Sequence, residues 1–131
     1  MSPSSAPKLK VFLVEDQDDT RFVLAYLLRS AGYEVREART VKAALQEFAA
    51  SGSEVLVSDV GLPDGSGCEL VRQLRQAGQA PYAIAMSGFG RSSDVAASLA
   101  AGFRHHLVKP IELEKLEQLL EAASAELGGA G

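Results

Sequence analysis

The sequence is poor in cysteine, in clustered positive charge and in long hydrophobic runs, and each absence excludes a class of protein. The single cysteine, Cys68, excludes an internal disulfide and a zinc site built on paired thiolates. The net charge is -4 and no Lys/Arg cluster occurs, which argues against a nucleic-acid-binding surface. No apolar run approaches the roughly 18 residues of a membrane span. Residues 1–10 also lack the apolar stretch of a secretory signal, so a cytoplasmic location is the simplest interpretation.

The remaining composition is that of one globular domain. The chain has 131 residues, of which 47% are hydrophobic and 23% charged, and these values suit a single domain with one core. Residues 1–7 are small and rich in proline and serine, which predicts a flexible lead or linker. The glycine-rich residues 128–131 predict a frayed tail, so the folded domain is expected over residues 8–127.

Short apolar segments alternate with segments of helical spacing along this domain. The apolar segments are residues 9–14, 33–38, 54–58, 81–86 and 103–108. Hydrophobic residues recur at offsets of three and four between them, beginning with Phe22, Val23, Tyr26 and Leu27. Five such βα units predict an α/β fold, a three-layer (βα)5 doubly wound parallel sheet with helices on both faces.

Residues at the expected helix ends and turns have suitable side chains. Thr40 and Ser66 are candidate N-caps for the second and third helices. Asp18 or Asp19 is expected to cap the first helix. Asp64 lies in a Pro-Asp-Gly sequence, and turn chemistry alone accounts for it.

Chemically reactive side chains follow the first, third, fourth and fifth expected strands. In chain order they are Glu15 and Asp16, then Asp59, Ser87 and Lys109. The carboxyl ends of parallel strands form the functional crevice of a doubly wound sheet, so these side chains are expected to meet there. Clustered carboxylates repel one another, and a hard divalent cation such as Mg²⁺ relieves that repulsion through oxygen ligands. A carboxylate beside such a cation can attack a phosphoryl group as a nucleophile.

With these residues in place, the sequence resembles the response-regulator receiver domain. The matching motifs are residues 14–16 (Val-Glu-Asp), 58–67 (Ser-Asp-Val-Gly-Leu-Pro-Asp-Gly-Ser-Gly), 86–88 (Met-Ser-Gly) and 108–110 (Val-Lys-Pro). Each motif alone is weak, but all four in this order at strand ends are specific, and the resemblance covers residues 8–127. It implies a flavodoxin-like sheet with strand order 2-1-3-4-5.

The resemblance also implies a role for each reactive residue. Asp59 is implied as the phospho-acceptor. The implied ligands of Mg²⁺ or Mn²⁺ are Glu15, Asp16, Asp59 and the backbone carbonyl of Gly61. Ser87 is implied as the switch hydroxyl and Lys109 as the phosphate-sensing amine, with a cis peptide bond between Lys109 and Pro110.

One position departs from the common pattern of this family. Receiver domains often carry Tyr or Phe three residues before the lysine, and that ring changes rotamer on phosphorylation. Here the position is His106, which can still act as a switch but has a smaller ring. The neighbouring His105 is expected to face the other side of the strand, so the two are not expected to be paired metal ligands.

By resemblance, the domain belongs to a two-component phosphorelay. It is expected to take a phosphoryl group from a phosphohistidine on a histidine kinase or a histidine phosphotransfer domain. Asp59 receives the group, and a change of conformation signals to a downstream effector through the fourth helix, fifth strand and fifth helix. The isolated domain is not expected to be an enzyme, although it catalyses its own phosphorylation and dephosphorylation.

Other functions of this fold agree less well with the residues. A phosphatase or phosphotransferase of the haloacid-dehalogenase type needs an Asp two residues after the nucleophile, where Gly61 stands. A flavin or nucleotide site needs a Gly/Ser/Thr-rich loop after the first strand, where residues 15–19 are mostly acidic. A receiver-like fold used as a passive binding module is a further alternative. The parent protein is either a stand-alone regulator or a hybrid histidine kinase, and the Pro/Ser-rich lead and His106 favour the hybrid.

Overall fold

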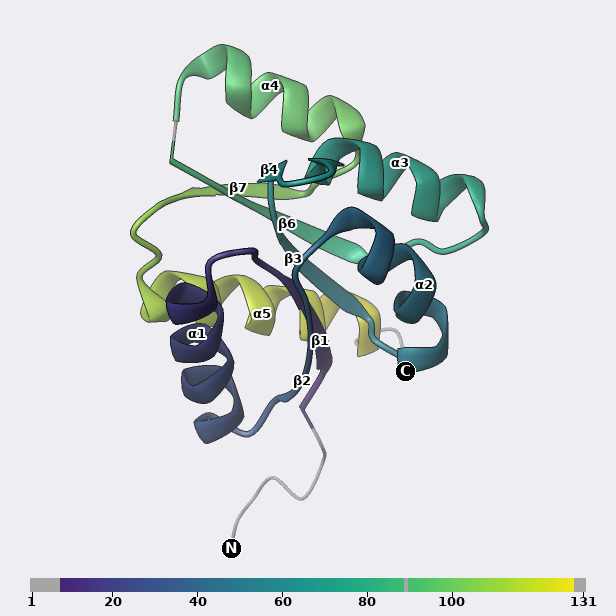
Figure 1. Ribbon diagram of the computed structural model, residues 1–131. Helices are drawn as coiled ribbons and strands as arrows, with labels where there is room; N and C mark the ends of the chain where they lie inside the picture. The colour runs from purple at the N-terminus through teal and green to yellow at the C-terminus, as the bar shows by residue number, and fades with distance from the viewer. Residues whose placement is uncertain (1–7, 89, 129–131) are drawn as a thin grey trace, which may run out of the picture.

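A central parallel sheet of five strands organises the molecule, and the computed structural model describes residues 8–88 and 90–128 (Figure 1). In spatial order the strands are β2 (Glu34–Ala38), β1 (Lys10–Val14), β3 (Val55–Asp59), β6 (Tyr82–Ser87) and β7 (His105–Val108). Neighbouring strands pair in parallel, so that Val11 lies between Val35 and Val55. The expected order 2-1-3-4-5 is confirmed when these five strands are numbered along the chain.

The helices of the described residues cover both faces of this sheet (Figure 1). On one face lie α1 (Asp18–Ser30) and α5 (Leu113–Gly128). On the other lie α2 (Val41–Ser51), α3 (Gly67–Gln76) and α4 (Ser92–Ala101). The expected three-layer α/β fold is therefore confirmed. Helix α5 includes Gly128, the first residue of the segment expected to be a tail, and the expectations for residues 1–7 and 129–131 lie outside the described residues.

The hydrophobic core has two layers, one on each side of the sheet. Leu24 and Leu28 of α1 meet Leu116 and Leu120 of α5 in the first layer. Phe12 meets Phe48 in the second, with ring centroids 5.4 Å apart and the rings tilted by 60°. Every residue of the central strand β3 is buried, because its alternating side chains enter both layers. None of the helices in the described ranges has the length and apolar character needed to cross a membrane.

Two of the predicted helix caps are present and one is not. Thr40 Oγ1 accepts a hydrogen bond from the Ala43 amide at 3.0 Å, and Ser66 Oγ accepts one from the Cys68 amide at 2.9 Å. The prediction that Asp18 or Asp19 caps α1 is wrong, because Gln17 occupies the N-cap position and makes no side-chain cap bond. Both aspartates lie in the first turn of α1, where their charge complements the helix dipole.

The apolar residues of α1 divide between the core and the surface. Leu24, Ala25 and Leu28 face the sheet. Of the four side chains singled out by their helical spacing, Leu27 is half-buried and the other three point outward. Phe22 and Val23 are each 57% exposed and Tyr26 is 69% exposed. The helix therefore has a second hydrophobic face that nothing in the described chain covers.

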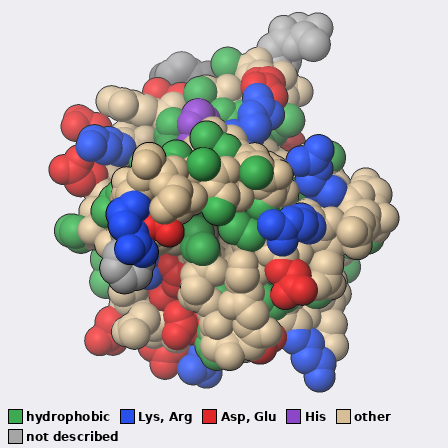
Figure 2. Space-filling view, turned by 90° about the horizontal axis from the view of Figure 1, so that it is seen from above, with side chains coloured by type: hydrophobic (Ala, Val, Ile, Leu, Met, Phe, Trp, Pro, Cys, Tyr) green, Lys and Arg blue, Asp and Glu red, His purple; other side chains and the backbone are tan. Residues whose placement is uncertain are grey.

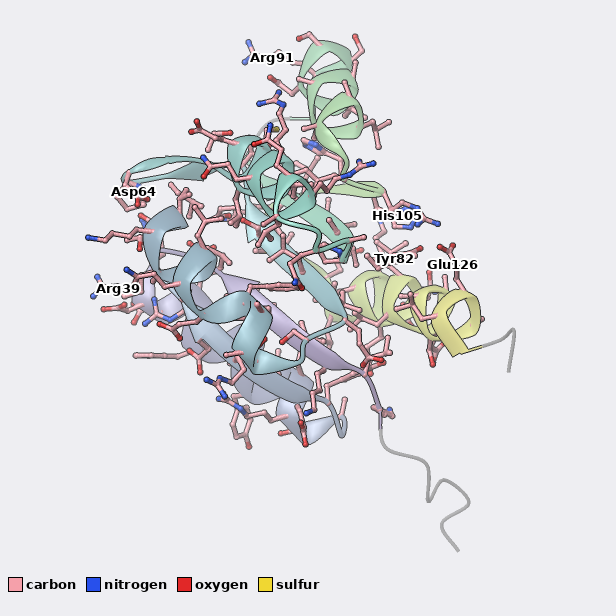
Figure 3. All side chains as sticks on the ribbon, turned by 90° about the vertical axis from the view of Figure 1, so that its right-hand side faces the viewer. Arg39, Asp64, Tyr82, Arg91, His105 and Glu126 are labelled. Carbon is pink, nitrogen blue, oxygen red and sulfur yellow. The ribbon has the colours of Figure 1, made fainter. Side chains whose placement is uncertain are left out.

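A small antiparallel hairpin that the sequence did not predict follows β3. Its strands are β4 (Gly61–Leu62) and β5 (Gly65–Ser66), and Asp64 lies in the turn between them. Turn chemistry is only part of the role of Asp64, since its carboxylate accepts hydrogen bonds from the Val41 amide at 2.8 Å and the Lys42 amide at 3.0 Å. These two bonds lower the pKa of Asp64 and attach the hairpin to the start of α2 (Figure 3).

Helix α4 is the helix least embedded in the fold. Only Ser98 and Ala101 are buried among its residues, and Leu99 is 47% exposed. Figure 2 looks down on this end of the molecule and shows hydrophobic side chains gathered near the centre of the face, with Lys and Arg side chains around them. A helix held by so few buried side chains can shift at low cost.

Candidate functional site

The sheet topology brings the reactive residues predicted from the sequence to one edge. Glu15 and Asp16 follow β1, Asp59 ends β3, Ser87 ends β6, and Lys109 follows β7. Main-chain hydrogen bonds hold these strand ends in register, among them Glu15 N to Ala38 O at 3.0 Å and Lys109 N to Ser87 O at 2.8 Å. The expected cis peptide bond between Lys109 and Pro110 is present.

Three carboxylates form a compact cluster at this edge. Glu15, Asp16 and Asp59 each offer an oxygen within 4.8 Å of the others. Glu15 is fully buried, Asp59 is 3% exposed and Asp16 is half-buried. Negative charges held this close in a buried setting repel one another strongly, so a cation belongs to the stable state of the cluster.

Lys109 supplies part of that positive charge. Its ammonium donates a hydrogen bond to Glu15 Oε1 at 2.7 Å and lies 2.7 Å from Asp59 Oδ1. Burial lowers the pKa of Lys109, but the interactions with Asp59 and Glu15 outweigh it and hold the pKa above its ordinary value. Lys109 is therefore a fixed cation that ties β7 to the ends of β1 and β3.

Asp59 is the carboxylate with unused bonding capacity. Its Oδ1 pairs with the charge of Lys109, yet it is the one buried side-chain oxygen or nitrogen in the described ranges without hydrogen-bond geometry to any partner. Burial raises the pKa of Asp59 to about 7, and hydrogen bonding to Glu15 raises it as well, against the lowering effect of Lys109. An oxygen in this condition is suited to bind a cation or to bond to an electrophile.

Glu15 is held more completely than Asp59. One carboxylate oxygen accepts from Lys109, and the other accepts from the Gln17 amide at 2.9 Å. Burial raises the pKa of Glu15, but hydrogen bonds with Asp59, Lys109 and Gln17 outweigh burial, so the pKa lies below its ordinary value. The two buried carboxylates therefore differ in protonation. Glu15 stays charged, whereas Asp59 takes up a proton near neutrality.

A cavity of about 460 Å³ opens beside the carboxylates. Asp16, Asp59, Gly61 and Lys109 line one part of it, and Ser87 and His106 line another. The cavity thus joins every residue predicted for the site except Glu15, which lies buried behind it. Cys68 also lines the cavity and is buried in the second core layer.

The backbone packs against Asp59 without any spare room. Gly67, the first residue of α3, donates from its amide to Val60 O at 2.8 Å. A Cβ at position 67 would lie 2.2 Å from the Asp59 carbonyl oxygen, so only glycine fits. Ser58 Oγ donates to that same carbonyl at 2.9 Å. These contacts fix the main chain that carries the Asp59 side chain.

The two histidines of β7 have separate environments, as predicted. His106 Nδ1 lies 2.9 Å from Oγ of Ser98, a fully buried residue of α4. His105 Nε2 lies 2.8 Å from the Tyr82 hydroxyl, near Glu126 at the other end of the sheet (Figure 3). Burial and the nearby Arg104 lower the pKa of His105. His106 therefore belongs to the cavity beside Asp59 and His105 does not.

The donor set fits a hard divalent cation. Carboxylate and carbonyl oxygens without thiolates or imidazoles are the ligands that Mg²⁺ prefers, and Mg²⁺ takes only one or two carboxylates directly. Asp59 and the half-buried Asp16 both line the cavity. The residues present therefore suit Mg²⁺ or Mn²⁺.

Known proteins share both the sequence pattern and the fold. Residues 11–121 match the family model described as the response regulator receiver domain. The chain is 37% identical over 113 residues to the KDP operon transcriptional regulatory protein KdpE of Escherichia coli, a match over 86% of this chain and 50% of KdpE. It is 33% identical to an uncharacterized 14.6 kDa protein of Leptolyngbya boryana, over 87% of this chain and 88% of that protein.

Solved structures agree with this relationship. The chemotaxis response regulator CheY4 of Vibrio cholerae superimposes with a TM-score of 0.82 at 28% identity, over 88% of this chain and 98% of CheY4. The receiver domain of the Francisella response regulator 1452 superimposes with a TM-score of 0.86 at 20% identity, over 92% of this chain and 99% of that domain. The chain spans half the length of KdpE. Together with the carboxylate cluster at the strand ends, these matches show that the chain belongs to the family of response-regulator receiver domains.

Proposed function

We propose that Asp59 of this receiver domain accepts a phosphoryl group from a phosphohistidine. The observation that carries the proposal is the buried Asp59 carboxylate, which lines the cavity and lies 2.7 Å from the ammonium of Lys109. Among the candidate residues it is the nucleophile with room for an electrophile, since both oxygens of Glu15 already accept hydrogen bonds.

The transfer needs one bond to form and one to break. An Asp59 oxygen attacks phosphorus, the P–N bond to the donor imidazole breaks, and the imidazole nitrogen takes up a proton. Lys109 is placed to pair with a phosphoryl oxygen after transfer, since its ammonium already lies 2.7 Å from Asp59 Oδ1. Ser87 lines the same cavity and would donate a hydrogen bond from its hydroxyl to a second phosphoryl oxygen.

Glu15, Asp16, Asp59 and the backbone carbonyl of Gly61 would hold Mg²⁺ or Mn²⁺. When bound, the cation supplies charge neutralisation for the phosphoryl group. Asp16 is the protein ligand with the freest carboxylate, because Glu15 is fully buried and bonded to Lys109. The metal assignment is supported by the cluster of three carboxylates within 4.8 Å of one another.

His106 and Ser98 extend the switch to α4. The Ser98 hydroxyl lies 2.9 Å from Val95 O and 2.9 Å from His106 Nδ1 and has one proton to donate. We assign that proton to Val95 O, which makes His106 Nδ1 the donor to Ser98. A movement of Ser87 toward the phosphoryl group changes the space around His106, and the hydrogen bond transmits that change to α4. We place the effector surface on α4, β7 and α5, where Leu99 and Val108 are each 47% exposed.

The phosphohistidine donor has a suitable docking surface on α1. A groove of about 600 Å³ lies between α1 and the segment after β7, lined by Val23, Leu27, Pro110 and Ile111. Lys109 borders both this groove and the cavity beside Asp59, so a protein seated on α1 can present a side chain to Asp59. The exposed Phe22, Val23 and Tyr26 supply the apolar contacts that a helical donor domain would cover.

The parent protein is either a single-domain regulator or a hybrid histidine kinase, and we favour the hybrid, in the cytoplasm. The domain by itself acts on no separate substrate beyond its phosphodonor. A phosphatase of the haloacid-dehalogenase type is disfavoured because Gly61 stands where that chemistry needs a general acid.

Intact mass after incubation with Mg²⁺ and acetyl phosphate tests the proposal. We expect a gain of about 80 Da, one phosphoryl group, that requires Mg²⁺ and is lost in Asp59→Asn. A protein histidine donor serves as a second phosphoryl source if acetyl phosphate does not react. Absence of the adduct with both donors, together with absence of Mg²⁺ binding, would leave a receiver fold used as a passive binding module.

A further inference from the structure

A buried arginine beside the carboxylate cluster has no part in the phosphoryl chemistry described above. Arg21 lies on α1 and is 6% exposed, an unusual position for a guanidinium. A buried charge of this kind persists only when its donors are satisfied, so its partners indicate its role.

Each of the three guanidinium nitrogens of Arg21 donates a hydrogen bond to a different segment of the chain. Nη1 donates to the backbone carbonyl of Glu15 at 2.9 Å, Nη2 donates to Asp18 Oδ1 at 2.8 Å, and Nε donates to Glu37 Oε1 at 3.2 Å. These acceptors lie at the end of β1, the start of α1 and the end of β2. The rigid fork of the guanidinium therefore joins three elements at the edge that carries the carboxylates.

The contact with Glu15 holds one side of the peptide group that leads to Asp16. The Glu15 side chain is already fixed by Lys109 and the Gln17 amide, and Arg21 fixes its carbonyl. Nothing in the described parts of the chain donates a hydrogen bond to the Asp16 carboxylate. Arg21 therefore holds the main chain from which the Asp16 side chain extends.

Asp18 is supported from a second direction as well. Arg39, in the segment after β2, lies 3.5 Å from Asp18 Oδ1 and is seen at the carboxyl edge of the sheet in Figure 3. Arg21 is the residue that connects this surface pair to the buried main chain. Arg21 thus contacts the buried main chain between β1 and α1 at Glu15 O. Arg39 contacts only the surface side chain of Asp18.

We propose that Arg21 is a positioning residue for the metal site, because it fixes the peptide between Glu15 and Asp16. This inference rests on the proposed function, which assigns those carboxylates to Mg²⁺. Lysine cannot replace Arg21, since a single ammonium has no fork to reach three acceptors at these separations. Arg21→Lys should affect Mg²⁺ affinity more than thermal stability, because lysine keeps the positive charge and the aliphatic stem of arginine.

The test compares Arg21→Lys and Arg21→Met with Arg29→Met as the matched control. Arg29 is on the same helix and also pairs with Glu37, at 3.0 Å, but it bonds to Val35 O and not to Glu15. Mg²⁺ affinity is measured without any phosphodonor, by titration of backbone amide NMR shifts. Thermal stability is measured in EDTA, and amide exchange of Asp16 and Gln17 is measured in the metal-free protein.

We expect Arg21→Lys to remain folded, to bind Mg²⁺ on the order of 10-fold more weakly and to exchange the Asp16 and Gln17 amides faster. Arg29→Met should keep the wild-type Mg²⁺ affinity even where it lowers thermal stability. Unchanged affinity and exchange in a folded Arg21→Lys would overturn the role of Arg21 alone. Equal weakening in Arg29→Met would overturn it too, and absence of Mg²⁺ binding by the wild type would overturn the proposed function with it.

Discussion

Lys109 lies equally close to two buried carboxylates, with Nζ 2.7 Å from Glu15 Oε1 and 2.7 Å from Asp59 Oδ1. One ammonium therefore serves two acids that belong to different strands. A phosphoryl group on Asp59 would compete with Glu15 for the ammonium of Lys109. Because Lys109 directly follows β7, a shift of its side chain would act on the end of that strand.

Removal of the Lys109 charge should destabilise the metal-free domain. We expect Lys109→Met to lower the free energy of unfolding by about 1–3 kcal/mol in EDTA, because two buried acids lose their shared cation. Mg²⁺ should restore part of the loss, since it neutralises the same acids. Chemical denaturation with and without Mg²⁺ measures both effects.

Lys115→Met is the control for that experiment. Lys115 pairs with Glu112 at 3.6 Å on the surface, where both side chains are more than half exposed. Its removal should leave stability nearly unchanged. Equal losses in both variants would contradict the special role of Lys109.

Asp59 should make stability depend on pH in the metal-free protein. Its pKa rises from 3.8 in the unfolded chain to about 7 in the fold. The folded state therefore binds this proton more tightly, and the resulting stabilisation is complete below the unfolded value and lost as pH rises through about 7. At pH 8 we expect Asp59→Asn to be more stable than wild type by up to about 4 kcal/mol, since one pKa unit corresponds to about 1.36 kcal/mol.

Denaturation in EDTA between pH 5 and pH 8 checks this sign. The advantage of Asp59→Asn should shrink toward the acid end of that range, where wild-type Asp59 is itself protonated. An advantage that grows on acidification would show that Asp59 is stabilised as a carboxylate.

The hydrogen bond between His106 and Ser98 predicts a tautomer. Neutral His106 should carry its proton on Nδ1 if the Ser98 hydroxyl donates its proton to Val95 O, as we assign it. Ser98→Ala should shift the population toward the Nε2–H form, which is the commoner tautomer of free imidazole. Long-range ¹H–¹⁵N NMR of the histidine side chains distinguishes the two forms.

Ser93→Ala provides the comparison, because Ser93 is an exposed residue of the same helix. It should leave the His106 spectrum unchanged. A wild-type His106 found mainly as the Nε2–H tautomer would rule out the assigned direction of the hydrogen bond.

The exposed apolar face of α1, formed by Phe22, Val23 and Tyr26 beside the groove, predicts a difference between phosphodonors. Tyr26→Ala should slow transfer from a protein histidine donor by about tenfold, equivalent to about 1.4 kcal/mol, because Tyr26 is 69% exposed on the docking face. Phosphorylation by acetyl phosphate should keep its wild-type rate, since the small donor needs no docking. Rapid-quench kinetics with each donor measures the two rates.

Leu127→Ala is the control for surface hydrophobicity, because Leu127 is 44% exposed on α5. It should change neither rate. A slower reaction of Tyr26→Ala with both donors would instead indicate a disturbed site.

The sequence predicts the site better than it predicts the contacts that support it. Asp59 and Lys109 could be assigned because parallel strands deliver their carboxyl ends to one edge, whatever the details of packing. Arg21 and Ser98 could not, since their roles depend on where a side chain reaches across elements. Spacing also misled at α1, where the pattern of Phe22 and Tyr26 is helical but faces solvent.

The contacts of Asp64 were also not predictable from sequence, because they join residues far apart in the chain. Its turn was predictable from local chemistry, but the bonds to Val41 and Lys42 span more than twenty positions of sequence. The missing cap on α1 has a similar cause, because Asp18 bonds to Arg21 and not to the free amides of its helix.

The attachment of Asp64 to α2 has a consequence for how the domain opens. The hairpin from Gly61 to Ser66 and the first turn of α2 share two hydrogen bonds, so neither can detach without exposing the other. They should therefore open as one cooperative unit, with the Val41 and Lys42 amides exchanging at the rate of the hairpin. The loop that carries Gly61 is therefore held by helix α2, although no residue of α2 lines the cavity beside Asp59.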